Sequence, residues 1–194
     1  MFEHAYGSYK KYAFPEDELM PLSCKGRRRG RERSRGDMDD SLGNFSLTLI
    51  DSLDTLPVLG MIDEFNSAVK YTVNNVNFDA ELVISVFETN IRIVGGLVGA
   101  HTMMLKLKAD PTYSNKFKWY NNQLIKKAVT IANKLAPAFD TNTGLPRSRV
   151  SMKSEDHANS FISSEQRQST CTACAGTMLM EFSALSYYRR VLHK

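Results

Sequence analysis

Long apolar runs are missing from this sequence, which has no stretch of about twenty apolar residues of the kind that spans a membrane. The first residues also lack the basic start, apolar run and cleavage site of a secretory signal. Either the protein is cytosolic or its signal lies outside this sequence. Three cysteines are too few for a disulfide framework, and the four histidines, His4, His101, His157 and His193, lack ligand spacing.

The composition is that of a globular protein, with 194 residues that are 42% hydrophobic and 24% charged. The net charge of +4 arises largely from one cluster, residues 25–35, in which six arginines are interspersed with two glycines. No aromatic residue for base stacking lies between these arginines, and most charge runs are simply solvated. The sequence therefore predicts a solvated loop here, and no nucleic acid as a partner.

Apolar residues recur at helical spacing along most of the chain, and this pattern predicts helices with almost no strands. The predicted helices are 1–12, a helix opening near 46 and running to about 59, 62–76, 85–108, 113–136 and 172–190, with an extended piece at 77–83. Residues 13–43 and 141–170 are predicted to be loops. Pro57 should kink or stop the second helix, because proline lacks the backbone N–H and clashes with the preceding turn.

Short connections between successive helices favour antiparallel neighbours, so the expected fold class is all-α, built from stacked αα-hairpins. The last predicted helix ends close to the end of the sequence. Its apolar face therefore has few remaining residues to cover it.

One apolar helix carries two charges on the same face. Glu88 and Arg92 stand four residues apart within Ser85-Val-Phe-Glu88-Thr-Asn-Ile-Arg92, which places both on one side of the helix. Removing a charge from water costs several kcal/mol before pairing returns part of it. Such a cost is usually tolerated for chemistry or for structural specificity.

Three further carboxylates lie in apolar helices: Asp51, Asp54 and Glu181. Each of them alone is more often structural, paired with an arginine or capping a loop. If their helices pack around one cavity, however, the acids can converge. Two convergent carboxylates are what glycoside hydrolysis requires, since one protonates the leaving oxygen and the other activates water.

Four motifs, in chain order, carry a resemblance to a known family. They are Asp17-Glu-Leu-Met-Pro21, Ser46-Leu-Thr-Leu-Ile-Asp51-Ser-Leu-Asp54, the Glu88/Arg92 motif and Thr170-Cys171-Thr-Ala-Cys174. Together they resemble the class I α-mannosidases of glycoside hydrolase family 47, and within it the ER degradation-enhancing α-mannosidase-like branch. Segment 26–37 and the cysteine doublet are most similar to the third paralogue of that branch.

The resemblance implies a partial (αα)7 barrel of about three helical hairpins, with residues 1–194 as the N-terminal portion of a catalytic domain. It implies a calcium-dependent, inverting α1,2-mannosidase that trims high-mannose N-glycans on misfolded glycoproteins in the endoplasmic reticulum lumen, for their degradation. A protein disulfide isomerase is implied as a partner.

The same resemblance assigns roles to residues. Glu88 corresponds to the general acid, and Arg92 to the arginine that orients the sugar and that acid. Asp51 and Glu181 correspond to pocket acids that hold the terminal mannose or its water. The family's other two catalytic carboxylates and its calcium-binding threonine fall beyond this sequence, so no metal ligand is expected within it.

Two alternatives follow from those missing groups. The chain is either a truncated form with little or no activity, or a non-catalytic, lectin-like protein that binds glycans or misfolded glycoproteins through the same pocket. Two smaller signals also stay open. Cys171 and Cys174 are either a redox pair or two buried thiols at a helix start. The sequon Asn44-Phe-Ser46 is either a helix cap or a glycan acceptor.

Overall fold

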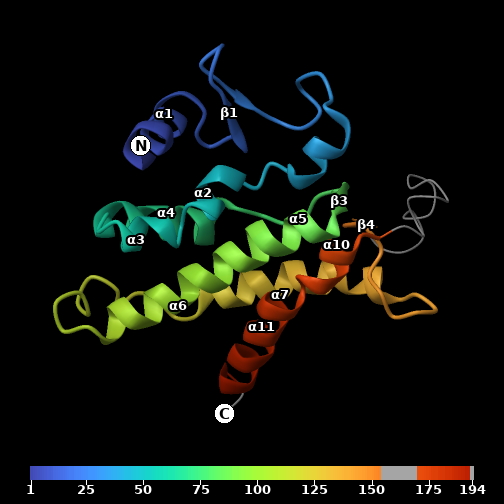
Figure 1. Ribbon diagram of the computed structural model, residues 1–194. Coiled ribbons are helices and arrows are strands. Elements are labelled where there is room, and N and C mark those ends of the chain that lie inside the picture. Colours follow the sequence, from blue (N-terminus) through green and yellow to red (C-terminus); the bar gives the residue numbers. More distant parts are fainter. Residues whose placement is uncertain (154–169, 193–194) are drawn as a thin grey trace.

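The computed structural model describes residues 1–153 and 170–192, and helices dominate these residues (Figure 1). The α-helices are α1 Phe2–Tyr12, α2 Leu47–Asp51, α3 Thr55–Val58, α4 Ile62–Asn75, α5 Val86–Glu88, α6 Gly95–Ala109, α7 Gln123–Leu135, α10 Thr172–Gly176 and α11 Leu179–Leu192. A π-helix, η2 Thr89–Val94, and two 3-10 helices, η1 Gly36–Ser41 and η3 Ala136–Phe139, complete the helical elements. The predicted helical class is confirmed.

Four short strands add two small antiparallel sheets. Strand β1 (Glu18–Met20) pairs with β2 (Lys25–Arg27), and β3 (Val83–Ser85) pairs with β4 (Arg149–Ser151). None of the helices in the described part of the chain is long and apolar enough to cross a membrane.

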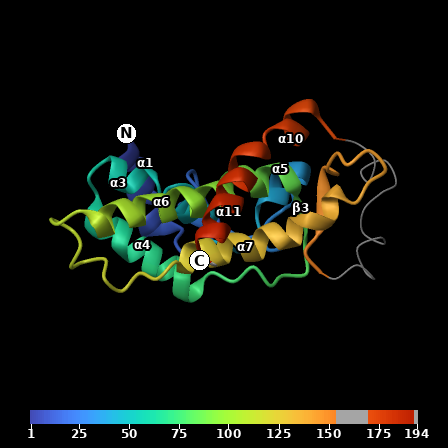
Figure 2. The ribbon, with the colours of Figure 1, turned by 90° about the horizontal axis from the view of Figure 1, so that it is seen from below.

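Helices α6 and α7 lie side by side along much of their length, and α11 crosses them obliquely (Figures 1 and 2). On the other side of α6 lie α2, α3 and α4 (Figure 1). The core fills the space between these layers with fully buried aliphatic and aromatic side chains. Examples are Ile50, Phe65, Ile93, Leu97, Phe117, Leu124 and Ile131.

The predicted helix over residues 46–59 is interrupted, as Pro57 led us to expect. The chain forms α2, turns at 52–54 and resumes as α3, which places Pro57 in the first turn of the new helix. The first four N–H groups of a helix have no intrahelical partner, so the proline removes no bond there.

The predicted helix over 113–136 is wrong in its first ten residues, since α7 begins only at Gln123. Asp110 folds the residues that follow it into turns, because its carboxylate accepts the N–H of Thr112 at 2.8 Å and its carbonyl accepts that of Ser114 at 2.8 Å. Trp119 then ties the segment to α4 through a 2.9 Å bond from its indole N–H to Asn66.

The other helix predictions are correct in kind and shifted in extent, whereas the predicted loop over 13–43 contains β1, β2 and η1. The helix predicted over 85–108 is present as α5, η2 and α6 without a break. Of the extended piece predicted over 77–83, only Val83 belongs to a strand, β3. The last predicted helix is split at Thr177 into α10 and α11. The predicted loop over 141–170 contains β4, and its residues 154–169 lie outside the described residues, as do His157 and His193.

One buried acid organises the segment predicted as a loop over 13–43. The Asp17 carboxylate is fully buried and accepts four backbone N–H groups, from Gly43 at 3.2 Å, Asn44 at 2.7 Å, Phe45 at 2.8 Å and Leu47 at 3.1 Å. These bonds dock the start of β1 against the start of α2, and so fix the position of the helix that ends at Asp51.

Candidate active site

The central element of the candidate site is the helix that carries Glu88 and Arg92. The hydroxyl of Ser85 accepts the N–H of Glu88 at 3.2 Å, which caps this helix at its start. The next turn, η2, widens into a π-helix that contains Arg92. Single π-turns inside α-helices occur frequently at functional sites, because the wider turn redirects side chains.

Arg92 joins two acids from different elements. Its Nε donates to Glu88 Oε2 at 2.6 Å, and its Nη1 lies 3.5 Å from Oδ2 of Asp51, at the end of α2. The three side chains are 31–45% exposed, so they line a surface that solvent reaches. The structure therefore brings together three of the four predicted site residues in one charged group.

The electrostatics of this group follow from partial burial and close charges. Burial raises the pKa of Asp51, and the carboxylates of Asp54 and Glu88 add to this, while Arg92 acts in the opposite direction. Burial by itself lowers the pKa of Arg92, but Glu88, Asp51 and, more weakly, Glu18 outweigh it and raise that pKa. Arg92 thus stays charged, and burial keeps the pKa of Asp51 above its ordinary value despite this neighbouring positive charge.

Glu181, the fourth predicted residue, lies on α11 and contacts the same long helix at a different point. Its Oε2 accepts a 2.9 Å hydrogen bond from the side-chain amide of Asn90. A Cβ atom placed on Gly95 would lie 3.6 Å from the Glu181 side chain, and one on Gly99 would lie 3.2 Å from Asp54. The two glycines therefore leave room where acids pack against the helix.

Asn90 was missed by the sequence analysis. It is fully buried, and its Oδ1 has no hydrogen-bond partner, as is also true of the hydroxyl of its neighbour Thr89. The available signal was a polar pair directly after Glu88, inside an otherwise apolar helix. Unpaired buried polar atoms are rare in folded proteins and mark places where a water or ligand group fits.

These residues do not fit a calcium site. Within residues 1–153 and 170–192 no group of three or more His, Cys, Asp or Glu side chains could hold a metal ion. Calcium takes about six to eight oxygen ligands, whereas Glu88 and Asp51 direct oxygens at the guanidinium of Arg92. The arrangement is suited to hydrogen bonding with a hydroxyl-rich ligand.

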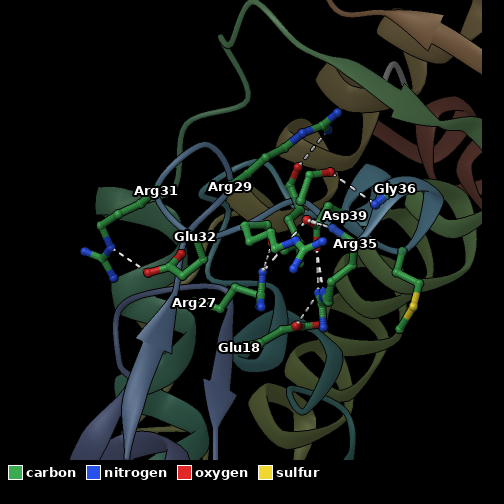
Figure 3. A network of polar contacts seen from close by, with 12 residues as sticks. Glu18, Arg27, Arg29, Arg31, Glu32, Arg35, Gly36 and Asp39 are labelled. Carbon is green, nitrogen blue, oxygen red and sulfur yellow. Dashed lines mark hydrogen bonds and ion pairs between the residues drawn. The ribbon is translucent and has the colours of Figure 1, made fainter. Parts of the chain in front are cut away.

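Residues 28–35 of the arginine-rich segment form a largely exposed loop, as predicted, but several of its arginines are paired with acids. Figure 3 shows Arg35 between Asp39 and Glu18, with both ion pairs at 2.8 Å. Nearby, Arg27, Arg29 and Arg31 pair with acids at 2.8–3.8 Å, namely Asp39, Asp40 and Glu32. These acids neutralise much of the positive charge of the segment, and the ion pairs hold it in place. Glu18, which pairs with Arg35, also contributes to the raised pKa of Arg92.

The interpretation of Cys171 and Cys174 as two buried thiols is wrong. The two sulfurs form a disulfide, Cys171 is exposed, and its Sγ accepts the N–H of Cys174 at 2.9 Å as the cap of α10. Cys24 is a free, exposed cysteine.

Comparison with known proteins identifies the family. The model of glycosyl hydrolase family 47 matches residues 1–190. ER degradation-enhancing alpha-mannosidase-like protein 3 of Homo sapiens is 51% identical over 188 residues, which are 97% of this chain and 20% of that protein. Alpha-mannosidase I MNS4 of Arabidopsis thaliana is 39% identical over 186 residues, 96% of this chain and 26% of that protein.

A solved structure is also similar. The alpha-1,2-mannosidase from Trichoderma reesei superimposes with a TM-score of 0.58 at 33% identity, over 77% of this chain and 28% of that one. The chain spans about a fifth to a quarter of the length of the two relatives above. With a family match over almost every residue and close relatives along the same span, this chain belongs to glycosyl hydrolase family 47.

Proposed function

We propose that this chain contributes the Glu88/Arg92 part of a catalytic site that removes α1,2-linked mannose from high-mannose N-glycans. The observation that carries the proposal is the charged group of Glu88, Arg92 and Asp51, held on one side of a capped and widened helix in a family 47 chain. The names of the relatives, ER degradation-enhancing alpha-mannosidase-like proteins, support glycoproteins destined for degradation as the substrates, and the endoplasmic reticulum lumen as the location.

The proposed roles follow from this geometry. Glu88 delivers a proton to the departing oxygen, directly or through a water, while Arg92 holds both the carboxyl group and the sugar in register. Asp51 and Glu181 accept hydrogen bonds from sugar hydroxyls. In an inverting mechanism the base lies across a gap of about 6.5–9.5 Å, which leaves room for the attacking water. We place that base, and a calcium site, in parts of the enzyme outside this chain.

An open groove supports the proposal that the chain is part of an (αα)7 barrel. The groove lies between α7 and α11, has a volume of about 650 Å³, and has an apolar lining that includes Val129, Ala132, Phe182 and Leu185. Leu179 and Met180 at the start of α11 are 74% and 80% exposed. Apolar surface of this kind is usually covered, and we propose that the next helical hairpin of the barrel covers it.

The exposed Cys171–Cys174 disulfide supports a protein disulfide isomerase as a partner, because an accessible disulfide can be attacked by a partner's thiolate. We propose this disulfide as the point of contact. The test uses a variant of a protein disulfide isomerase in which the second active-site cysteine is replaced by serine. This variant should form a stable mixed disulfide with Cys171 or Cys174.

The decisive experiment compares Glu88→Gln with Glu81→Gln in the enzyme that contains this chain. Both changes remove one negative charge, but Glu81 is 74% exposed and pairs with Lys153, away from Arg92. Loss of a general acid lowers the rate by about 10²–10⁴-fold. We therefore expect Glu88→Gln to slow mannose release from a high-mannose glycan by about this factor, with glycan binding retained, and Glu81→Gln to release mannose at the original rate.

A rate of mannose release in Glu88→Gln equal to that in Glu81→Gln would refute the assigned acid. An unmodified protein that binds the glycan and never releases mannose would instead favour the lectin-like function.

A further inference from the structure

The structure distinguishes between the two interpretations of the sequon Asn44-Phe45-Ser46, a helix cap and a glycan acceptor. A helix cap would need a side chain that accepts N–H groups from the first turn of α2. Ser46 occupies the cap position, yet its side chain makes no capping bond. Asp17 accepts the N–H of Leu47 instead, together with the three preceding N–H groups. Asn44 therefore has no capping role.

The backbone of Asn44 is fixed while its side chain is exposed. The N–H of Asn44 donates to Asp17 Oδ2 at 2.7 Å, and φ is 59°, a left-handed conformation that asparagine tolerates better than most residues. The next residue, Phe45, is completely buried and packs edge-on against Phe78. Within the described residues no hydrogen bond engages the Asn44 amide, so it projects from a rigid turn into solvent.

We propose that Asn44 carries an N-linked glycan. The amide nitrogen of Asn44 forms a bond to the anomeric carbon of a lipid-linked oligosaccharide; the bond from that carbon to the lipid pyrophosphate breaks, and the amide loses a proton. The acceptor signal consists of the asparagine and the hydroxyl two residues later. This inference rests on the proposed location in the endoplasmic reticulum, and not on the proposed mannosidase activity.

The fold also dictates when this transfer occurs. In the folded chain the Ser46 hydroxyl is buried and donates to the carbonyl of Pro15 at 2.7 Å, and Asp17 holds the Asn44 backbone. Both elements of the acceptor signal are thus engaged by residues 15–17. Glycan transfer therefore precedes the docking of β1 against α2, and the folded chain is a poor acceptor that nevertheless accommodates the glycan, since the modified side chain faces solvent.

The test directs the complete chain into the endoplasmic reticulum with a cleavable signal sequence. Asn44→Gly removes the acceptor and is compatible with the positive φ. A reporter variant, Asn44→Gly with Asp79→Ser, moves an identical Asn-Phe-Ser tripeptide to the exposed Asn77. We expect a glycosidase-sensitive mobility shift in the original chain, loss of the shift in Asn44→Gly and its return in the reporter.

A modified reporter together with an unmodified original chain would overturn the proposal. In a second measurement, the unmodified chain made in bacteria is offered to the purified transferase before and after refolding. We expect modification of the unfolded chain only, and equal modification of both would overturn the proposed timing. Because neither measurement uses mannosidase activity, failure here is distinct from failure of the proposed function.

Discussion

The side-chain amide of Asn90 donates a 2.9 Å hydrogen bond to Glu181, which lies 91 residues later in the chain. This bond ties α11 to the helix of the candidate site, two residues after Glu88. Because Asn90 is fully buried, breaking the bond would leave a polar group without a partner, which costs about 1–3 kcal/mol. The last helix is therefore coupled to the geometry around Glu88 and Arg92.

Gly96 is a second point at which the site depends on close packing. A Cβ atom at this position would lie 2.7 Å from the backbone carbonyl oxygen of Ile50, so α2 would have to move. Alanine favours a helix over glycine by about 1 kcal/mol, yet overpacking of a core costs about 1–3 kcal/mol. We expect Gly96→Ala to lower the free energy of unfolding, measured in urea, and to displace Asp51.

Gly95→Ala is the matched control, since a Cβ there meets its nearest neighbour, the Glu181 side chain, at 3.6 Å, an ordinary contact. This variant should be as stable as the original chain or slightly more stable. Equal losses in the two variants would mean that helix α2 does not pack as described.

Asp17 should be among the most sensitive positions outside the Glu88/Arg92 group. Asn in its place presents one acceptor oxygen and an NH₂ group to four backbone N–H groups, so two or more of these donors lose their partner. Each such loss costs about 1–3 kcal/mol. We expect Asp17→Asn to lower the free energy of unfolding by about 3 kcal/mol or more in urea titrations.

The neighbouring Glu18→Gln variant is the control for this change. The Glu18 side chain is 31% exposed and pairs with Arg35, and a partly exposed ion pair contributes at most about 1 kcal/mol. Losses of similar size in both variants would contradict the organising role of Asp17.

The sequence predicted the helices well where apolar spacing was regular over several turns. The helix that carries Glu88 is an example, because its apolar period is visible in the sequence; its two charged side chains, however, are partly exposed and not buried as the sequence suggested. The start of α7 at Gln123 was not predictable in this way. It depends on the turns that Asp110 begins and on the hydrogen bond from Trp119 to Asn66, which lies 53 residues earlier.

For the candidate site, the same distinction holds. The pairing of Glu88 with Arg92 followed from their spacing on one helix, and it is present at 2.6 Å. The contact between Arg92 and Asp51 was expected only as convergence, because helix packing decides it. The ion pairs of Arg35 and the contact of Asn90 with Glu181 depend on tertiary neighbours that no local pattern specifies.

The disulfide between Cys171 and Cys174 should contribute little to stability. It closes a loop of only three residues' separation, and such short loops restrict the unfolded chain by at most about 2 kcal/mol. The Sγ of Cys171 also caps α10, and a serine hydroxyl can replace it in that bond. We expect the double serine variant to exceed the double alanine variant in free energy of unfolding by about 1 kcal/mol.

Chemical denaturation of the two variants, both without the disulfide, isolates the cap from the covalent bond. A double serine variant no more stable than the double alanine variant would show that the cap at Cys171 is not needed. Adding a reductant to the original chain should reproduce the stability of the double serine variant.

His101 should make stability depend on pH. It is buried, its Nδ1 lies 2.7 Å from the hydroxyl of Tyr120, and the ring of Tyr188 packs edge-on against it at 4.6 Å. Burial lowers the pKa of His101 to about 4, from an ordinary value of 6.5. Between these values the unfolded chain binds a proton that the folded chain does not, so stability is complete above about pH 6.5 and falls as the pH drops toward 4.

His101→Gln retains a polar group beside Tyr120 but does not titrate. Over the interval from pH 7 to 4 the original chain should lose up to about 3 kcal/mol more than this variant, the upper limit for a shift of this size. Carboxylates titrate in both proteins, so only the difference between their stability curves reports on His101. Parallel curves from urea titrations at pH 7, 6, 5 and 4 would show that His101 is as accessible to protons in the folded chain as in the unfolded one.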